Sequence, residues 1–318
     1  MSEEIPPRAP SALGRDDGGW EPLGAVKNVL VLISSPAHPA LNDGAITCAV
    51  DVLRAQGATV GVPDWLAPEV ACDIPFDGPS SGVAMTALDG VVVATAGRRK
   101  KLLVADMEST MIENEMLDEL ADFLGLREKI ADITARAMNG EIDFAAALDE
   151  RVGLLKGLPI ARLDEAAKRI RYTPGGATLV ATMKQHGAAC ALVSGGFTYF
   201  TTLVRQALGF DLDAANALKH DGRTLSGTVE PPILDKEAKL ATLERLAAEH
   251  GLPIADTLSV GDGANDLPML KAAGLGVAFH AKPVVAAEVQ ARIDHGDLTA
   301  LLYLQGYRRS DFVERNDP

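Results

Sequence analysis

Two carboxylates and two hydroxyls follow an apolar run near the middle of the chain. Residues 102–105 are apolar, and Asp106 and Glu108 come directly after them. If the run is a strand of a parallel α/β sheet, Asp106 stands at its carboxyl end, where such sheets bind ligands. An aspartate placed there can attack phosphorus. A structural interpretation is also open, because Thr110 and Glu113 have the spacing of a capping box at a helix start.

Two later apolar runs also end in residues suited to a phosphate or a cation. The run 189–193 is followed by Ser194 and two glycines, and a glycine turn lets backbone N–H groups approach a phosphate. The run 257–260 leads into a glycine loop with three polar side chains: Asp262, Asn265 and Asp266. Such oxygen ligands suit Mg²⁺. Each loop also fits an ordinary turn before a helix, so neither decides the function alone.

Lys239 lies between these two loops, in a helix expected over residues 237–250. Lysines on helices are usually solvated. If the first turn of this helix faces the same sheet edge, however, its ammonium reaches both a bound phosphate and Asp106.

The elements that must position these residues alternate between helix and strand. From residue 179 on, helices are expected over 179–186, after 196, over 237–250 and over 267–273, with strands over 189–193, 257–260 and 276–278. This alternation predicts a parallel sheet with right-handed crossovers. The stretch from Thr110 to about Arg171 has helical apolar spacing and no strand signal, so we expect a helical insertion after the first core strand.

Composition and charge exclude several classes of function. The 318 residues carry a formal charge of −14, which argues against a nucleic-acid partner. An acidic enzyme with an anionic substrate must concentrate positive charge locally, through a divalent cation and placed Lys or Arg. The three cysteines, Cys48, Cys72 and Cys190, have no paired spacing, so no disulfide framework or zinc site is indicated. Without a signal peptide or a long apolar run, we expect a cytoplasmic protein with no membrane contact.

The first third of the chain predicts a small, separate unit. Residues 1–24 are polar and are expected to be a disordered tail. Strands are expected over 28–34, 59–62 and 70–74, with a helix over 41–56, which together make an α+β unit. The basic run 97–101 is expected to be a solvated linker at the domain boundary.

Taken in chain order, the motifs DMEST, SGG, Lys239 and GDGAND resemble the four motifs of the haloacid-dehalogenase-like (HAD) phosphatases. Within that superfamily, the chain resembles the phosphoserine phosphatase family. The features that carry this closer resemblance are Glu115 with the helix at 117–121, the segments 137–144, 151–152 and 154–158, SGGF at 194–197 and GDGANDLPML at 261–270. The resemblance covers about residues 99–302. The first unit is similar to the ACT-like N-terminal domain of bacterial members.

The resemblance implies an α/β fold: a HAD-like Rossmannoid parallel sheet core, a helical cap inserted after the first core strand, and a small α+β (ACT-like) N-terminal domain. The implied division is a tail at 1–24, an ACT-like domain at 25–92, a core at 98–112 and 173–305, a cap at 113–172 and a C-terminal tail at 306–318.

The implied reaction is Mg²⁺-dependent hydrolysis of O-phospho-L-serine to L-serine and phosphate through an aspartyl-phosphate, the last step of serine biosynthesis. The implied catalytic residues are Asp106 as nucleophile, Glu108 as acid and base, and Lys239. The implied metal ligands are Asp106, the backbone carbonyl of Glu108, Asp262 and Asp266. The implied phosphate ligands are Ser194, Gly195, Lys239 and Asn265. In the cap, Glu115 would meet the substrate ammonium, Arg151 its carboxylate, and Met138 and Phe144 would exclude water.

One position departs from the family pattern: Glu108 stands where the family has aspartate. The added methylene extends the side chain by roughly 1.5 Å, and a misplacement of about 1 Å can cost on the order of 10²-fold in rate. Two alternatives to phosphoserine hydrolysis therefore stay open: a phosphatase for another small phosphomonoester, and an amino-acid-sensing protein with a weakened phosphatase domain. A homodimer is a further option that the sequence leaves undecided.

Overall fold

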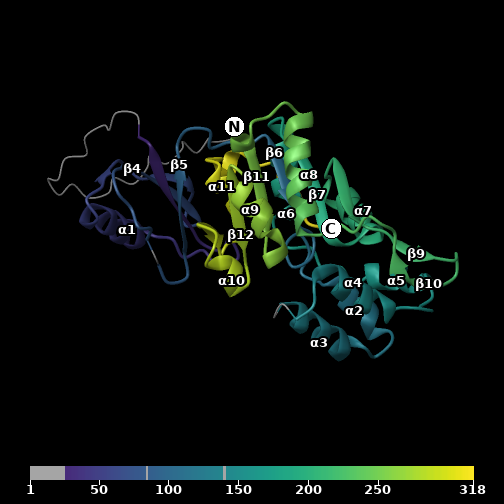
Figure 1. Cartoon of the computed structure of the whole chain (residues 1–318). Coiled ribbons are helices and arrows are strands. Elements are labelled where there is room, and N and C mark those ends of the chain that lie inside the picture. Colours follow the sequence, from purple (N-terminus) through teal and green to yellow (C-terminus); the bar gives the residue numbers. More distant parts are fainter. Residues whose placement is uncertain (1–25, 84, 139–140) are drawn as a thin grey trace, which may run out of the picture.

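The chain is represented by a computed structural model that describes residues 26–83, 85–138 and 141–318 (Figure 1). The tail expected over residues 1–24 lies outside this described part. A small N-terminal sheet lies at one end of the molecule, a larger parallel sheet in the middle and a group of helices at the other end. Within the described ranges, no helix has both the length and the apolar character needed to span a membrane.

The central sheet has six strands in the order β13-β12-β11-β6-β7-β8, and every neighbouring pair is parallel. The strands are β6 (Leu102–Ala105), β7 (Ala189–Phe197), β8 (Leu212–Asn216), β11 (Thr257–Gly261), β12 (Leu275–Phe279) and β13 (Ala291–Ile293). The predicted parallel sheet is confirmed. All residues of β6 are buried, as expected for a central strand covered on both faces. The edge strands β8 and β13 were not predicted.

Helices cover both faces of this sheet. They are α6 (Gly176–Gln185), α7 (Thr198–Leu208), α8 (Lys236–Glu249), α9 (Leu267–Ala272), α10 (Pro283–Ala286) and α11 (Ala300–Leu304), with short 3₁₀ turns η1 (Ile254–Asp256), η2 (Ala264–Asp266) and η3 (Arg309–Asp311). Alternate residues of β6 face different layers: Leu102 and Val104 pack with α8 and α9, whereas Leu103 and Ala105 join the cluster that includes α6 and α11. The sheet is therefore buried from both sides.

The insertion after β6 is helical, as predicted. It contains α2 (Met116–Asp122), α3 (Arg127–Met138), α4 (Phe144–Gly153) and α5 (Ala161–Ala167). A hairpin of β9 (Leu218–His220) and β10 (Leu225–Val229), which comes from the later part of the chain, lies beside α4 (Figure 1). The backbone N–H of Leu225 donates to the carbonyl of Leu158 at 2.9 Å. The sequence analysis placed no strands there.

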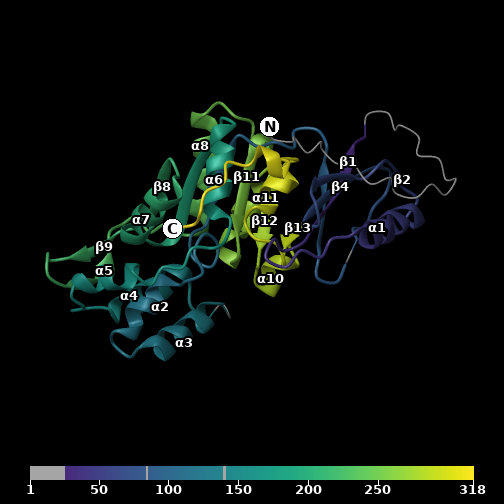
Figure 2. The ribbon, with the colours of Figure 1, turned by 180° about the vertical axis from the view of Figure 1, so that it is seen from behind.

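The N-terminal unit is a mixed α+β layer, as expected. It contains β1 (Asn28–Ile33), α1 (Asp43–Ala55), β2 (Thr59–Val60), β3 (Asp64–Ala67), β4 (Ala71–Asp77) and β5 (Asp89–Ala94) in an antiparallel sheet. Leu30 and Leu32 pack in the cluster that includes α1, whereas Val29 and Val31 join the cluster that includes α11. Figure 2 shows α1 on the outer side of this sheet. The ACT-like assignment stays a prediction.

The expectation of a solvated linker is wrong for Arg98. Its side chain is only 13% exposed, and its guanidinium donates to both carboxylate oxygens of Asp73, at 2.5 and 2.7 Å. It also donates to the backbone carbonyls of Tyr303 and Leu304. Arg98, at the expected domain boundary, thus joins β4 to the end of α11. Its cation stabilises the buried Asp73 carboxylate, because a buried charge is costly unless it is paired.

Candidate active site

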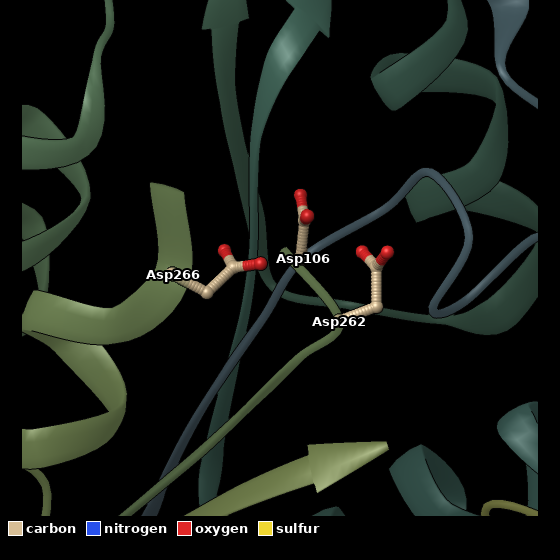
Figure 3. A group of neighbouring side chains, drawn as sticks. All are labelled: Asp106, Asp262 and Asp266. Atoms are coloured by element: carbon tan, nitrogen blue, oxygen red, sulfur yellow. The ribbon is translucent and has the colours of Figure 1, made fainter. Parts of the chain in front are cut away.

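Three aspartates from two loops meet at the carboxyl edge of the central sheet. Asp106 follows β6, Asp262 follows β11 and Asp266 ends η2, and one oxygen from each lies within 4.8 Å of the others. Figure 3 shows the Asp106 and Asp262 carboxylates side by side and that of Asp266 turned toward Asp106. The sequence argument that parallel strand ends bring these residues together is confirmed. Hard oxygen ligands in this number fit a divalent cation such as Mg²⁺.

Lys239 lies under this cluster and is 1% exposed. Its Nζ lies 2.7 Å from Asp106 Oδ1 and 2.6 Å from Asp266 Oδ1. It comes from the first turn of α8, which is fixed by the Asp235 side chain accepting the Ala238 N–H. Burial lowers the pKa of Lys239, but the two carboxylates outweigh burial and raise that pKa above its usual value. The lysine therefore stays charged.

The contacts of the Asp106 side chain fall on one oxygen. Lys239 and the Met107 N–H, at 2.8 Å, both approach Oδ1. Within the described residues, Oδ2 receives no hydrogen bond. Burial and the charge of Asp266 raise the pKa of Asp106, and Lys239 opposes that rise. An ionised Asp106 thus has one oxygen held in place and one available to an electrophile or a cation.

The loop after β11 is tightly folded around Asp266. The Gly263 N–H donates to Asp266 Oδ2 at 3.0 Å. A Cβ on Gly261 would lie 2.4 Å from Asp266 Cγ and 2.7 Å from Asp266 Cβ, so this position favours glycine, whereas one on Gly263 would lie 2.3 Å from the terminal Oδ1 of Asn265 and would displace that side chain. Burial raises the pKa of Asp262, and Lys282 partly offsets this effect.

The end of β7 contains the buried Ser194, whose Oγ accepts the Gly196 N–H at 3.0 Å, so residues 194–196 belong to the strand and not to a separate turn after residue 193. Asn216 holds this strand end from the side: its Nδ2 donates to the Gly195 carbonyl at 2.8 Å, and its Oδ1 accepts the Leu234 N–H at 2.7 Å. It thereby ties the end of β7 to the segment that leads into α8 and Lys239. Asn216 was not among the predicted site residues, because β8, the strand that it ends, was not predicted.

Glu108 lies between the sheet edge and the inserted helices. Its Oε1 accepts the N–H of Met116, the first residue of α2, at 2.7 Å. The capping-box interpretation of Thr110 and Glu113 is therefore wrong: the helix begins at Met116 after the N-cap residue Glu115, and the Glu108 side chain accepts its first N–H. Burial and the nearby Glu115 raise the pKa of Glu108 well above its usual range. The Glu108 side chain is not part of the three-aspartate cluster.

The Glu108 carboxylate lies against Gly196 at the end of β7. A Cβ at that position would lie 2.7 Å from Glu108 Oε2, the end of a flexible side chain. The Glu108 carboxylate therefore reaches both the end of β7 and the first turn of α2, and it joins the sheet edge to the helical insertion.

The helical insertion brings charged and aromatic side chains to the same place. The exposed Glu115 accepts the Ser109 hydroxyl at 2.7 Å. Burial lowers the pKa of Arg151, and the charges of Glu108 and Glu115 oppose this change. The Phe144 ring reaches within 3.3 Å of where a Cβ of Gly195 would stand. Met138 ends α3, but its side chain lies outside the described residues.

Lys282 is a second residue that the sequence analysis missed. It follows β12, and its Nζ lies 3.4 Å from Asp262 Oδ2. Burial lowers the pKa of Lys282, but Asp262, Glu115 and Asp106 together raise it overall. The rule that located Asp106 and Asp262, a polar residue at the carboxyl end of a parallel strand, also applies to Lys282, because the strand over 276–278 was predicted.

Comparison with known proteins agrees with this architecture. A relative from Streptomyces coelicolor, named phosphoserine phosphatase, is 43% identical over 231 residues, which is 71% of this chain and 56% of that protein. A phosphoserine phosphatase from Methanocaldococcus jannaschii is 40% identical over 205 residues, 64% of this chain and 97% of that protein. A HAD family hydrolase structure from Salmonella enterica serovar Typhi matches with a TM-score of 0.75 at 27% identity, covering 87% of this chain and 98% of that one.

The chain spans little more than half the length of the Streptomyces relative. Residues 103–271, more than half of the chain, match the family described as haloacid dehalogenase-like hydrolase, and this range contains β6, the helical insertion, Lys239 and the acidic loop. With this match and the parallel sheet that carries the aspartates at its carboxyl edge, the chain belongs to the haloacid dehalogenase-like hydrolase family.

Proposed function

We propose that the chain is a Mg²⁺-dependent phosphatase that hydrolyses O-phospho-L-serine. The observation that carries this proposal is the buried Asp106–Lys239–Asp266 arrangement, which lies next to side chains of both charges from the helical insertion. The buried arrangement offers a nucleophile and a cation to a phosphate group. The charged side chains of the insertion can bind the ammonium and the carboxylate of an amino acid. The names of the Streptomyces and Methanocaldococcus relatives support the same substrate.

In the proposed reaction, Asp106 Oδ2 attacks phosphorus and the serine oxygen leaves with a proton from Glu108. Water then attacks the aspartyl-phosphate, and Glu108 takes up its proton while phosphate departs. The raised pKa of Glu108 favours the protonated form that the first step requires. Lys239 opposes the rise in the pKa of Asp106 and holds its Oδ1 in position, so that Oδ2 can attack.

The proposed Mg²⁺ ligands are oxygens from Asp106, Asp262 and Asp266, with the backbone carbonyl of Glu108. When bound, the ion would neutralise charge on the phosphate oxygens. The Ser194 hydroxyl, the Gly195 N–H, Lys239 and Asn265 would hold the remaining phosphate oxygens.

The proposed substrate contacts in the cap divide by charge. Glu115 would meet the ammonium of phosphoserine, and the Arg151 guanidinium its carboxylate through a two-pronged pair. Phe144, which already contacts the Gly195 turn, and Met138 would exclude water from the reacting atoms.

The test is phosphate release from a matched set of phosphomonoesters in the presence of Mg²⁺. Phosphoserine should be preferred over phosphoethanolamine, which lacks the carboxylate, and over glycerol phosphate, which lacks both charged groups. If another ester ranks first, the proposed substrate is wrong. If the chain is inactive while Glu108→Asp is active, the proposed role of Glu108 in this chain is wrong.

A further inference from the structure

Lys282 lies beside the acidic cluster but outside every motif identified in the sequence. Its backbone N–H donates to the Asp262 carbonyl at 3.1 Å, and its Nζ lies 3.4 Å from Asp262 Oδ2. The Lys282 side chain is 46% exposed, whereas that of Asp262 is 8% exposed. The ammonium therefore covers Asp262 on its solvent side.

The two lysines at the cluster are held to different degrees. Among the residues that the structure describes, Lys239 and Lys282 are the lysines with Nζ within 4.0 Å of the three aspartates. Lys239 is enclosed between two carboxylates, and moving it would leave a buried charge unpaired. Lys282 approaches one oxygen at longer range and meets solvent, so it can turn toward a ligand at little cost.

The charges around the cluster oppose the entry of a phosphate. The chain has a formal charge of −14, and Asp106, Asp262 and Glu115 all act on the Lys282 ammonium. A phosphomonoester dianion that approaches these carboxylates is repelled. A cation at the entrance reverses the local potential, raises the local concentration of the anion and speeds its association.

We propose that Lys282 is a substrate-steering residue, which pairs with Asp262 while the site is open and turns to a phosphate oxygen of the arriving substrate. This inference rests on the proposed phosphatase function. It gives Lys282 opposite effects on two ligands. The ammonium attracts the phosphate dianion, but it competes with a divalent cation for Asp262.

The experiment compares Lys282→Gln and Lys282→Arg with a matched control, Lys271→Gln. Lys271 in α9 is also a half-exposed lysine in an ion pair, 2.7 Å from Glu288, but it does not contact the three aspartates. Lys282→Gln should raise the KM for phosphoserine about 5–20-fold at low salt, and salt should reduce this difference while kcat stays within about twofold. Lys282→Arg should restore most of the KM.

Calorimetry on the same variants measures the competition between Lys282 and a divalent cation, and it requires no catalytic turnover. Lys282→Gln should bind Mg²⁺ about 3–10-fold more tightly than the unmodified protein, because a repelling charge next to Asp262 is gone. It should bind inorganic phosphate more weakly in the presence of Mg²⁺. Lys271→Gln should change neither. Circular dichroism melting checks that each variant is folded.

Two results would overturn the proposal. In the first, Lys282→Gln matches Lys271→Gln in KM, salt dependence and Mg²⁺ affinity. In the second, the loss falls on kcat with KM unchanged, which would place Lys282 in the chemical step. If the unmodified chain does not hydrolyse phosphoserine, the proposed function fails, but the Mg²⁺ and phosphate titrations still decide the role of Lys282.

Discussion

The inner and outer parts of the candidate site are built differently. The inner part, Asp106, Lys239 and Asp266, is buried and joined by contacts of 2.6 and 2.7 Å. The outer part, Glu115, Arg151 and Lys282, is exposed or partly exposed and has fewer or longer contacts. The inner residues keep their geometry without a ligand, whereas the outer residues have charge left to offer one. This difference fits the proposed function, in which the inner part carries the chemistry and the outer part selects the substrate.

Burial explains why the inner part is so firmly held. Charges removed from water must be paired, and removing one partner leaves the others uncompensated. The outer residues are less buried and more accessible to water, so we expect their pairing energies to be smaller. The four predictions below test whether this contrast is correct.

The largest expected effect is from Asp106→Asn, which removes the proposed nucleophile. We expect kcat/KM for phosphoserine to fall by about 10⁴-fold or more, measured by phosphate release. Asp256→Asn is the control, because Asp256 precedes β11 at the opposite sheet edge and pairs with Lys101. If Asp106→Asn keeps a tenth of the activity, the inner part does not carry the chemistry.

The second effect is on stability. Lys239→Met leaves Asp106 and Asp266 facing each other without a cation, and we expect a loss of about 3–5 kcal/mol in the free energy of unfolding. Urea unfolding at pH 7 measures it. Lys101→Met, which removes a 62% exposed lysine from its pair with Asp256, should cost at most about 1 kcal/mol. Equal losses of stability in the two variants would contradict the distinction between buried and exposed ion pairs.

The third prediction concerns the outer part. Arg151→Lys keeps the charge but loses the planar two-pronged geometry, so kcat/KM for phosphoserine should fall about 10–100-fold. Phosphoethanolamine has no carboxylate to lose, and its kcat/KM should change by less than about threefold. Arg162→Lys, in α5 and paired with Glu165, is the control. A parallel loss for both substrates would show that Arg151 acts on folding or chemistry instead.

The smallest expected effect concerns a buried ion pair far from the site. It tests whether burial alone makes an ion pair important for stability. Arg98→Met removes the partner of the buried Asp73 and should cost about 1–3 kcal/mol at pH 7. Burial raises the pKa of Asp73 even with Arg98 in place.

The sign of the pH dependence follows from that raised pKa. Without Arg98 the pKa of Asp73 rises further, so the loss of stability is greatest at neutral pH. It shrinks as the pH falls through the raised pKa, because a protonated Asp73 needs no cation. Urea unfolding at several pH values measures the difference between variant and parent. A difference that is independent of pH would mean that Arg98 acts through packing.

The sequence predicted the inner part of the site better than its supports. Asp106, Asp262 and Asp266 could be placed together because parallel strands end at one sheet edge, and the structure confirms this placement. Lys239 was expected to join them if the first turn of its helix faced that edge, which it does. Asn216 and Lys282 were missed. Asn216 ends a strand with a weak apolar pattern, and its contacts with Gly195 and Leu234 join segments that local patterns do not connect. Lys282 belongs to no motif, although the strand-end rule that located Asp106 and Asp262 also applies to it.

The same limit explains two wrong interpretations. Thr110 and Glu113 have the spacing of a capping box, but α2 begins only at Met116, and the first N–H of this helix donates to Glu108. Arg98 has the neighbours of a solvated linker, but it meets Asp73 from another sheet. Both errors came from judging a polar residue by its sequence neighbours alone.

The parallel sheet, the helical insertion and the residues that gather at the sheet edge follow from local features of the sequence, namely apolar periodicity and the residue types at strand ends. The packing of the folded chain sets which charges are buried, which oxygen of Asp106 is free, and how Glu108 joins the sheet to α2. Those outcomes depend on distances between segments that are remote in sequence, since burial and Coulomb energy are set by the surrounding atoms.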